Sequence, residues 1–521
     1  MKNHALDLRN RDGLFADLES RVFDLAVIGG GITGAGVARD AALRGLSVAL
    51  IEARDFASGT SSRSSKMIHG GLRYLAQGDL ALVREAASER KIVQAIAPHL
   101  ARETPFVLPA RNAGAIAKLR AGLWTFEKLG GVPRSRRHEV WSLADLRARE
   151  PAIAADGLAG AVVYPEYLTD DARLTLANIR SAAASGAVVV SYASAKSILT
   201  ESGRATGIEV VETLPGAPGR RARLRARMVV NAAGPWVDAV RALEADDAPP
   251  RLSLTRGVHL VVPHEKLPVT RTVIMTASDR RGVFAVPRGA ITYLGTTDTF
   301  HPLAETWPPV TADDADYLFA AAAARFSTPP LTHADIISVW SGVRPLVAEA
   351  GKSASDISRR DELWTGPAGV LSIAGGKLTA YRRMAERVVD EVETGLGHKP
   401  RPCRTAVEPL IGGDAASDIA DIPGGPADQA AYAVTHEGAL TLEDYWVRRT
   451  ARAWFDLDAG MAALEPAAGA MAPLLGWSEA RKVEEIAACK QIHARDMSAF
   501  FLPPLTGEGG LERNDKTGGE V

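Results

Sequence analysis

Phe23-Asp-Leu-Ala-Val-Ile-Gly-Gly-Gly-Ile-Thr-Gly34 is the stretch that decides the fold of this chain of 521 residues. Its first six residues predict a short buried strand, and a helix is expected over residues 35–44, after the glycines. Residues 46–51 predict a second strand, which ends at Glu52. This order of strand, turn, helix and strand is typical of a dinucleotide-binding unit.

The spacing of the glycines predicts how the turn holds a diphosphate. Gly29 permits the tight turn, Gly31 lets a pyrophosphate approach the backbone, and Gly34 lets the helix and the strand pack closely. The N-terminus of the helix presents free N–H groups to the diphosphate. Glu52 is expected to bind ribose hydroxyls, and its charge disfavours the 2′-phosphate of NADP. The motif alone does not separate FAD from NAD.

Composition bounds the class of protein. A chain of 521 residues is too long for one core, so two or three domains are expected. Lys and Arg (61) nearly cancel Asp and Glu (62), which gives no reason to expect a nucleic-acid partner. The two cysteines fit a reducing cytosolic compartment and cannot form a Cys-rich metal site, so no metal is expected. A secretory signal and a membrane-spanning run are not expected either.

Further strands and helices are expected beyond the first unit. Buried strands are predicted at residues 158–163, 187–192, 227–231 and 370–374, helices at 111–130, 171–185 and 378–393, and antiparallel sheet over 255–298. Residues 60–74 are dense in hydroxyls, glycines and cations. They form either a polar surface loop or a loop that holds phosphates and the edge of a flavin ring.

Several separated motifs recur in one order along the chain. They are Asp40 after the glycine turn, His69-Gly-Gly-Leu-Arg-Tyr-Leu75, Asp170-Asp-Ala-Arg-Leu174, Asn231-Ala-Ala-Gly-Pro-Trp236, Gly295-Thr-Thr-Asp298, Ser341-Gly-Val-Arg-Pro-Leu346, Gly375-Gly-Lys-Leu-Thr379, Tyr381-Arg382 and Arg448-Arg-Thr450. From about Phe23 to Phe500, this series resembles the FAD-dependent glycerol-3-phosphate dehydrogenases.

The resemblance implies a fold and a reaction. The fold is α/β with an α+β insertion: a glutathione-reductase-like FAD-binding fold, an antiparallel-sheet substrate domain and a helical C-terminal domain. The implied cofactor is non-covalent FAD. The implied reaction transfers a hydride from C2 of sn-glycerol 3-phosphate to flavin N5, gives dihydroxyacetone phosphate, and passes the electrons to membrane quinone.

Domain boundaries follow from the same resemblance and from the turn-rich segments. We expect an N-terminal extension over residues 1–20 and a discontinuous FAD-binding domain over 21–397. The inserted substrate domain is expected at roughly 75–160 and 245–345. A linker over 398–425, a helical domain over 426–505 and a disordered tail over 506–521 complete the chain.

The motifs also supply the expected cofactor-binding residues. They are Gly29, Gly31, Ile32, Thr33, Gly34, Glu52, Thr60, Ser61, Ser65, Lys66, His69, Gly70, Gly71, Ala233, Gly234, Gly375, Gly376, Lys377, Leu378 and Thr379.

A dianionic phosphate substrate calls for several convergent arginines, whose planar fork holds two phosphate oxygens at once. Arg344 is the first candidate, supported by Arg73 and by Arg359 or Arg360. Each could also be a solvated ion-pair partner.

Proton transfer and charge stabilisation need further groups. His259 could accept the hydroxyl proton, or be a hydrogen-bonded histidine in a strand. Lys377 is expected to stabilise the reduced flavin, unless it faces solvent. Tyr74 could bond the substrate hydroxyl or be a core aromatic residue. The sequence does not choose the base.

Two positions depart from the family pattern and put the substrate in doubt. Arg288 follows Pro287 where an aromatic residue is usual, and the run Ser358-Arg-Arg-Asp361 carries an extra residue. A dehydrogenase of another polyol phosphate such as erythritol phosphate therefore stays open. An oxidase and a non-catalytic FAD-bound sensor are further alternatives.

Membrane contact is expected from the helix at 111–130. Trp124 and Phe126 accompany Lys118, Arg120 and Lys128, and three arginines follow at 134, 136 and 137. Aromatic side chains with cations suit an anionic lipid surface, although a helix packed on its own domain fits as well. We expect peripheral attachment at the inner face of the cytoplasmic membrane, and a homodimer is possible.

Overall fold

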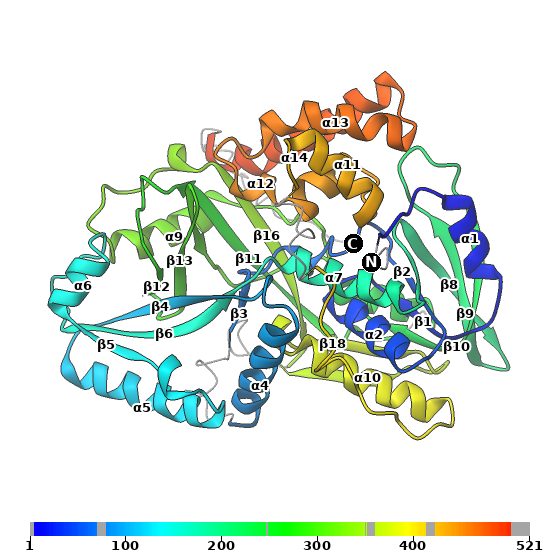
Figure 1. The fold of residues 1–521 in the computed structure, drawn as a ribbon, viewed down its shortest axis with the longest axis horizontal. Helices are drawn as coiled ribbons and strands as arrows, with labels where there is room; N and C mark the ends of the chain where they lie inside the picture. The colour runs from blue at the N-terminus through cyan, green and yellow to red at the C-terminus, as the bar shows by residue number, and fades with distance from the viewer. Residues whose placement is uncertain are drawn as a thin grey trace, which may run out of the picture.

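The computed structural model describes residues 5–69, 80–245, 248–349, 351, 360–412 and 422–501. The described residues form two sheets with helices packed around them (Figure 1). The first sheet contains β1 (Phe23–Ile28), β2 (Val48–Ile51), β7 (Val188–Val190), β8 (Ala193–Glu201), β9 (Arg204–Glu212), β10 (Arg221–Asn231), β17 (Asp361–Thr365) and β18 (Leu371–Gly375).

The centre of this first sheet is parallel. β1 pairs with β2 on one side and β10 on the other, and β7 and β18 extend the parallel order outward. Such a sheet is covered on both faces, which explains why β1 and β2 are apolar almost throughout. The strands expected near residues 23, 46, 187, 227 and 370 all form.

Helices cover the parallel sheet and flank the second one. The α-helices described before residue 400 are α1 (Arg11–Glu19), α2 (Ile32–Leu43), α4 (Leu80–Ile96), α5 (Ala113–Leu129), α6 (Leu143–Arg149), α7 (Asp171–Ala184), α8 (Val237–Ala242), α9 (Ala312–Ala323) and α10 (Tyr381–Gly395). Of these, α2 packs between α7 and α10 beside the parallel sheet, as Figure 1 shows.

The second sheet is mainly antiparallel, as expected for residues 255–298. Its strands are β3 (Met67–Ile68), β4 (Arg102–Ala110), β5 (Glu139–Ser142), β6 (Gly160–Leu168), β11 (Leu252–Pro263), β12 (Thr272–Thr276), β13 (Gly282–Arg288), β14 (Ile291–Gly295), β15 (Thr299–Phe300) and β16 (Ser338–Val347). The long pairing of β11 with β16 runs from Leu252 opposite Val347 to Val261 opposite Ser338.

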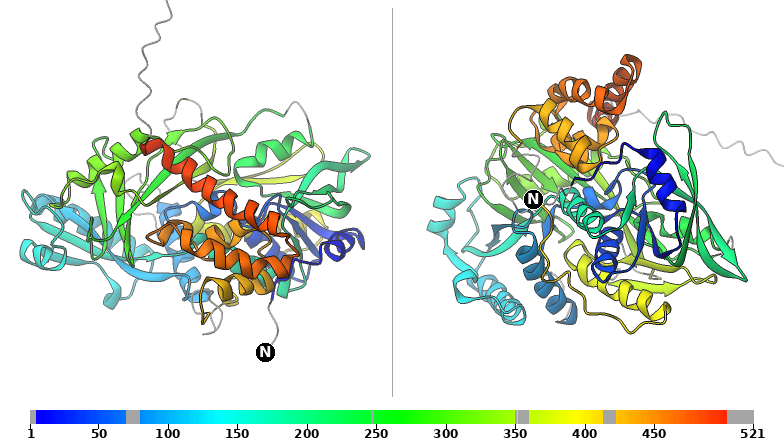
Figure 2. Two further views of the ribbon diagram at one scale, coloured as in Figure 1. Left: turned by 90° about the horizontal axis from the view of Figure 1, so that it is seen from above. Right: turned by 45° about the vertical axis from the view of Figure 1, so that its right-hand side comes forward.

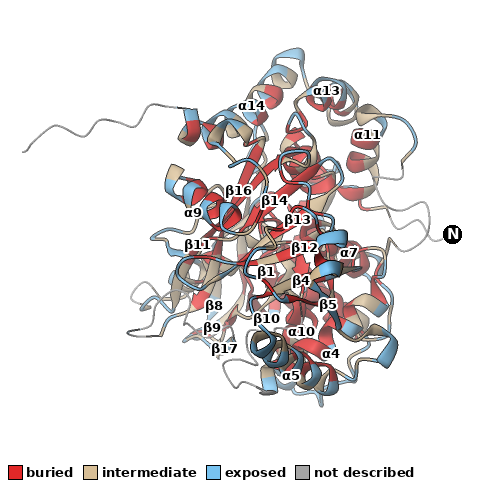
Figure 3. Cartoon of the chain, turned by 90° about the vertical axis from the view of Figure 1, so that its left-hand side faces the viewer, coloured by how far each residue is buried: buried red, intermediate tan, exposed pale blue. Residues whose placement is uncertain are grey.

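The predicted helical C-terminal region is present. It contains α11 (Pro426–Glu437), the π-helix η7 (Asp444–Arg449), α12 (Arg452–Phe455), α13 (Met461–Leu475) and α14 (Glu479–Phe501). These helices pack together above the two sheets, with their buried faces turned inward (Figures 2 and 3). The domain boundaries stay a prediction. The tail at 506–521 and part of the linker lie outside the described residues.

Helix α5 forms where the sequence predicts it, but one of its aromatic residues is not on the surface. Phe126 is buried against Val83 and Ala87, so its placement with Trp124 in a lipid-facing patch is wrong. Trp124 is 54% exposed. None of the helices in the described part of the chain is long and apolar enough to span a bilayer.

Candidate active site

A cavity of about 1050 Å³ lies between the two sheets. This volume exceeds what one small ligand needs and leaves room for a dinucleotide with a small second molecule. Predicted site residues that line it are Gly29, Gly31, Ile32, Thr33, Glu52, Thr60, Ser61, Ser65, His69, Ala233, Gly234, His259, Arg344, Gly375, Gly376, Lys377, Leu378 and Thr379. The structure therefore brings together residues that are up to 350 positions apart in sequence.

The glycine turn forms one wall and fits a diphosphate closely. Gly29 has φ +111°, and a Cβ atom there would lie 2.6 Å from the Ala232 oxygen. A Cβ atom at Gly34 would lie 1.9 Å from the Gly29 oxygen, so only glycine allows α2 to approach β1 this closely. Gly34 does not line the cavity itself, which agrees with its predicted role in packing. The turn leaves the backbone open toward the cavity, as a bound pyrophosphate requires.

Glu52 lies at the end of β2, at the border of the cavity. Its Oε2 accepts the Gly30 N–H (2.7 Å) and its Oε1 accepts the Arg54 N–H (2.9 Å). Burial raises the pKa of the Glu52 carboxyl. The side chain thus holds the turn and the next segment together while it borders the end of the cavity where a ribose would lie.

The hydroxyl-rich loop forms a second wall and is not a plain surface loop. The Thr60 hydroxyl donates to the Val343 oxygen (2.6 Å), and Ser61 Oγ accepts the Ile32 N–H (2.9 Å). Lys66 does not line the cavity. Its ammonium is buried, 2.6 Å from Asp171 Oδ1, and also donates to the Ser62 oxygen, so the structure does not support its predicted contact with the cofactor.

The third wall follows β18. Gly375 and Gly376 both have positive φ and lead into Lys377, whose charge lies near His69. The Thr379 hydroxyl donates to the His69 oxygen (3.1 Å). Burial, with Lys377 and Arg90 nearby, lowers the pKa of His69 to about 3. His69 is therefore neutral at pH 7.

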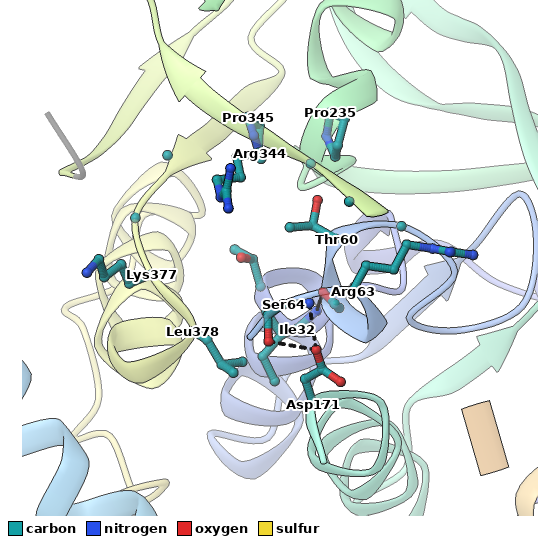
Figure 4. A pocket seen from close by; sticks show the side chains of 18 of the residues that line it. Ile32, Thr60, Arg63, Ser64, Asp171, Pro235, Arg344, Pro345, Lys377 and Leu378 are labelled. Atoms are coloured by element: carbon teal, nitrogen blue, oxygen red, sulfur yellow. Dashed lines mark hydrogen bonds between the residues drawn. The ribbon is translucent and has the colours of Figure 1, made fainter. Parts of the chain in front are cut away.

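Arg344 projects from β16 into the cavity (Figure 4). Its guanidinium donates to Asp298 Oδ1 (3.0 Å), Thr296 Oγ1 (3.1 Å) and the Thr297 oxygen (3.3 Å). A Cβ atom at Gly257 would lie 2.0 Å from its terminal nitrogen, so glycine there makes space for the guanidinium. Arg344 is held in one orientation at the cavity surface.

Of the other predicted phosphate-binding arginines, the structure describes Arg360 alone. Arg360 is exposed and is not among the residues that line the cavity. Gly70, Gly71, Arg73, Tyr74 and Arg359 lie outside the described residues.

Arg288 does not line the cavity either. Its guanidinium lies 3.7 Å from the ring centroid of Phe455 and 3.7 Å from Asp170 Oδ2.

His259 lies on β11 and is 1% exposed. Its ring stacks on Trp340 with 4.7 Å between centroids, and its Nε2 shares a hydrogen bond of 2.8 Å with Ser65 Oγ. Burial, together with the charges of Arg344 and Lys66, keeps the pKa of His259 well below its ordinary value. The imidazole is therefore neutral at pH 7, and the same burial and neighbouring cations make it a weaker base than a free histidine.

The neutral state of buried His259 predicts a pH dependence of stability. Because its folded pKa lies below the unfolded value of 6.5, the unfolded chain binds a proton that the folded chain does not. Above about pH 6.5, His259 therefore costs the folded state no stability. As the pH falls below 6.5, the free energy of unfolding decreases by up to about 1.4 kcal/mol per pH unit. Urea unfolding between pH 7.5 and 5 should show a smaller loss for His259→Gln than for the wild type. Equal losses would contradict this reading.

Sequence reasoning missed several residues of the site. The sequence assigns no role to Asp298 beyond its place in the motif Gly295-Thr-Thr-Asp298, but its carboxylate accepts a hydrogen bond from Arg344 and orients the guanidinium. Asp171 accepts hydrogen bonds from the Ser64 N–H and hydroxyl and pairs with Lys66, as Figure 4 shows in part. Neither pairing has a signal in the spacing, since the partners are 46 and 105 positions apart.

Comparison with known proteins agrees with this geometry. Residues 24–382 match the family model described as FAD dependent oxidoreductase, and residues 426–482 match the C-terminal domain of alpha-glycerophosphate oxidase. The chain is 37% identical to the aerobic glycerol-3-phosphate dehydrogenase of Bacillus subtilis, over 88% of this chain and 92% of that one. It is 42% identical to the Staphylococcus aureus protein of the same name, over 79% and 74% of the two chains.

The chain belongs to the FAD-dependent glycerol-3-phosphate dehydrogenase family.

Solved structures agree with this family assignment. The glycerol-3-phosphate dehydrogenase from Bacillus halodurans, complexed with FAD, superposes with a TM-score of 0.78 at 32% identity, over 95% of this chain and 99% of that one. The glycine oxidase from Geobacillus kaustophilus shares the fold at 22% identity and a TM-score of 0.55. FAD is thus the cofactor of this family member, and the expected glutathione-reductase-like fold is confirmed.

Proposed function

We propose that this protein oxidises sn-glycerol 3-phosphate to dihydroxyacetone phosphate, with membrane quinone as the final electron acceptor. The single observation that carries the proposal is the cavity shared by the glycine turn and Arg344. A glycine turn and an oriented guanidinium that line one cavity fit a flavin beside an anionic substrate. The names of the relatives from Bacillus and Staphylococcus support the same substrate.

The residues of this chain have distinct roles in the proposed reaction. FAD, when bound, supplies a hydride acceptor for C2 of the substrate. Arg344 holds the phosphate, and its bonds to Asp298 and Thr296 fix the direction of the guanidinium. His259 is the candidate acceptor of the hydroxyl proton of the substrate, and its Nε2 forms a hydrogen bond with Ser65 Oγ. Lys377 supplies positive charge on the cofactor side.

Arg73, Tyr74, Arg359 and Arg360 stay proposed substrate contacts on the motif resemblance alone. A dianion buried in a cavity needs more than one cationic partner, which favours further arginines near Arg344. A longer polyol phosphate such as erythritol phosphate remains the second candidate substrate, because the same groups would bind its phosphate.

Steady-state kinetics with an artificial acceptor tests the substrate. We expect kcat/KM for sn-glycerol 3-phosphate to exceed that for glycerol, for the opposite enantiomer and for both erythritol 4-phosphate enantiomers by at least about 100-fold. Glycerol lacks the phosphate, the opposite enantiomer presents its C2 substituents differently, and erythritol phosphate carries an extra carbon and hydroxyl. A higher kcat/KM for an erythritol phosphate would move the assignment to that substrate.

Peripheral attachment to the inner face of the cytoplasmic membrane is part of the proposal. The inward face of α5 packs Leu123 and Phe126 into the protein, which leaves Trp124 exposed with Lys128 5.7 Å from its ring. An exposed indole beside cations is suited to the headgroup region of anionic lipid. In flotation with anionic vesicles, Trp124→Ser should reduce the bound fraction severalfold. If the vesicle-bound fraction of Trp124→Ser equals that of the wild type, Trp124 of α5 is not the membrane contact.

A further inference from the structure

Buried ion pairs join the C-terminal helices to the segment that follows β2, next to the glycine turn. Asp55 lies in the segment after β2 and is fully buried. Arg449 grips its carboxylate with two bonds, of 2.6 Å to Oδ2 and 2.8 Å to Oδ1, and Arg448 Nε adds a third of 2.5 Å. Both arginines are also buried. The pairing therefore joins two regions almost 400 positions apart without exposure to solvent.

The π-helix explains how consecutive arginines reach one carboxylate. Thr450 closes the wide turn, with its N–H 3.1 Å from the Tyr445 oxygen. A π-turn holds more residues than an α-turn, so neighbouring side chains diverge less, and such turns are frequent at functional sites. Arg448 also donates to Asp444 Oδ1 (2.8 Å), which accepts the Tyr192 hydroxyl as well (2.6 Å). The geometry of η7 thus allows Arg448 and Arg449 to donate to the same Asp55 carboxylate.

Asp55 is directly connected to the glycine turn. Ala57, two residues on, donates its N–H to the Gly30 oxygen (3.1 Å), while Glu52 accepts the Gly30 N–H. The ring of Phe56 lies so close to Gly30 that a Cβ atom there would be 2.6 Å from it. The segment from Glu52 to Ser58 borders the cavity at both of its ends. A displacement of Asp55 would therefore move the residues that shape the pyrophosphate and ribose site.

A second contact joins the same helices to the hydroxyl-rich loop. Arg63 lines the cavity but its side chain points away from Arg344 (Figure 4), and its guanidinium lies 3.7 Å from the ring centroid of Trp307 and 5.8 Å from that of Trp454 of α12. Its three side-chain nitrogens have no hydrogen-bond partner in the described part of the chain. Cation–π contacts with these two tryptophans stabilise this position of the guanidinium. Its neighbours Thr60, Ser61, Ser64 and Ser65 all line the cavity.

We propose that the C-terminal helical region is a clamp on the FAD site, in which Arg449 and Arg448 act through Asp55 as positioning residues for the cofactor. Docking of these helices and binding of FAD then stabilise each other, because each favours the same conformation of the segment from Glu52 to Ser58. The inference rests on FAD as the cofactor and does not depend on the identity of the substrate.

The test measures FAD affinity in full-length protein without substrate. We expect Arg449→Met to raise the FAD dissociation constant about 50-fold and Arg449→Lys about 10-fold, since lysine keeps the charge but loses the two-pronged grip. Asp55→Asn should weaken FAD binding in the same direction. Fluorescence of released FAD on dilution gives the constants.

A matched control separates a clamp from a plain stability effect. Arg452 belongs to the same helical region and pairs with Asp456 (2.6 Å) and Gln429 (2.9 Å), away from the cofactor loops. Arg452→Met should lower the melting temperature equally at limiting and at saturating FAD. Arg449→Met should lower it more at saturating FAD, because the FAD-induced increase shrinks when the coupling is lost.

The outcome that overturns the clamp is equally definite. If folded Arg449→Met binds FAD within twofold of the wild type, and its melting temperature falls equally at both FAD concentrations, the ion pairs only stabilise the fold. Should Arg449→Met fail to fold, Arg449→Lys decides by the same two measurements. A failure of substrate turnover leaves these constants unaffected, so the two proposals fail separately.

Discussion

Replacing Arg344 with methionine is expected to lower kcat/KM for glycerol 3-phosphate about a thousandfold while FAD stays bound. The guanidinium lines the cavity in a fixed orientation, and its loss removes the two-pronged partner proposed for the substrate phosphate. Most of the loss should appear in KM if Arg344 binds the ground state and transition state alike. Steady-state kinetics and the flavin spectrum of the purified variant measure both effects.

Arg256 provides the matched control for that experiment. It lies on β11, next to β16, and forms a comparable ion pair with Asp314 (2.7 Å), but it does not line the cavity. Arg256→Met should change kcat/KM less than threefold at a temperature where the protein is folded. If Arg344→Met keeps kcat/KM within tenfold of the wild type, Arg344 is not the phosphate-binding residue.

Replacing Gly34 with alanine is expected to give protein that retains almost no FAD. The added Cβ atom would lie 1.9 Å from the Gly29 backbone oxygen, and both residues belong to the turn that is expected to receive the pyrophosphate. Relief requires α2 to move away from β1, which costs roughly 1–3 kcal/mol or more and distorts the turn. The ratio of flavin to protein absorbance after gel filtration measures the loss.

A glycine without such a neighbour serves as the control. Gly469 lies within α13, and a Cβ atom there would meet nothing within 4 Å. Alanine is the better helix former by roughly 1 kcal/mol, so Gly469→Ala should keep full FAD and melt slightly higher. Normal FAD content in Gly34→Ala would show that the turn tolerates a wider separation of helix and strand than the structure suggests.

The parallel unit was predictable because its signals are local. Phe23–Ile28 is uniformly apolar, the glycines follow at fixed spacing, and Glu52 ends the next strand, so sequence distance and spatial distance agree. Helices α5 and α7 were predictable for the same reason. Phe126 shows what such patterns cannot predict. Periodicity places Phe126 on the apolar side of α5, but it does not reveal that α4 packs against that side and buries the ring.

The candidate site was predictable only where a motif carries it. Arg344 follows Gly342 by two residues within β16, and Lys377 follows Gly375 and Gly376 at the end of β18; these glycines mark both motifs, and both residues line the cavity. Lys66 lies in an equally polar stretch, but its buried ammonium forms an ion pair with Asp171 and does not face the cavity. A buried charge is unfavourable unless it has such a partner. The contact of Arg449 with Asp55 has no local signal, since tertiary packing alone brings η7 over the loop.

Anaerobic addition of sn-glycerol 3-phosphate to the purified yellow protein tests the central claim most directly. If the cavity binds FAD against the glycine turn and the substrate beside Arg344, the flavin absorbance near 450 nm should bleach within the first turnover, with one equivalent of dihydroxyacetone phosphate formed per flavin. An absorbance that stays unchanged with this substrate and with related polyol phosphates would contradict the assignment as an enzyme and favour an FAD-bound sensor.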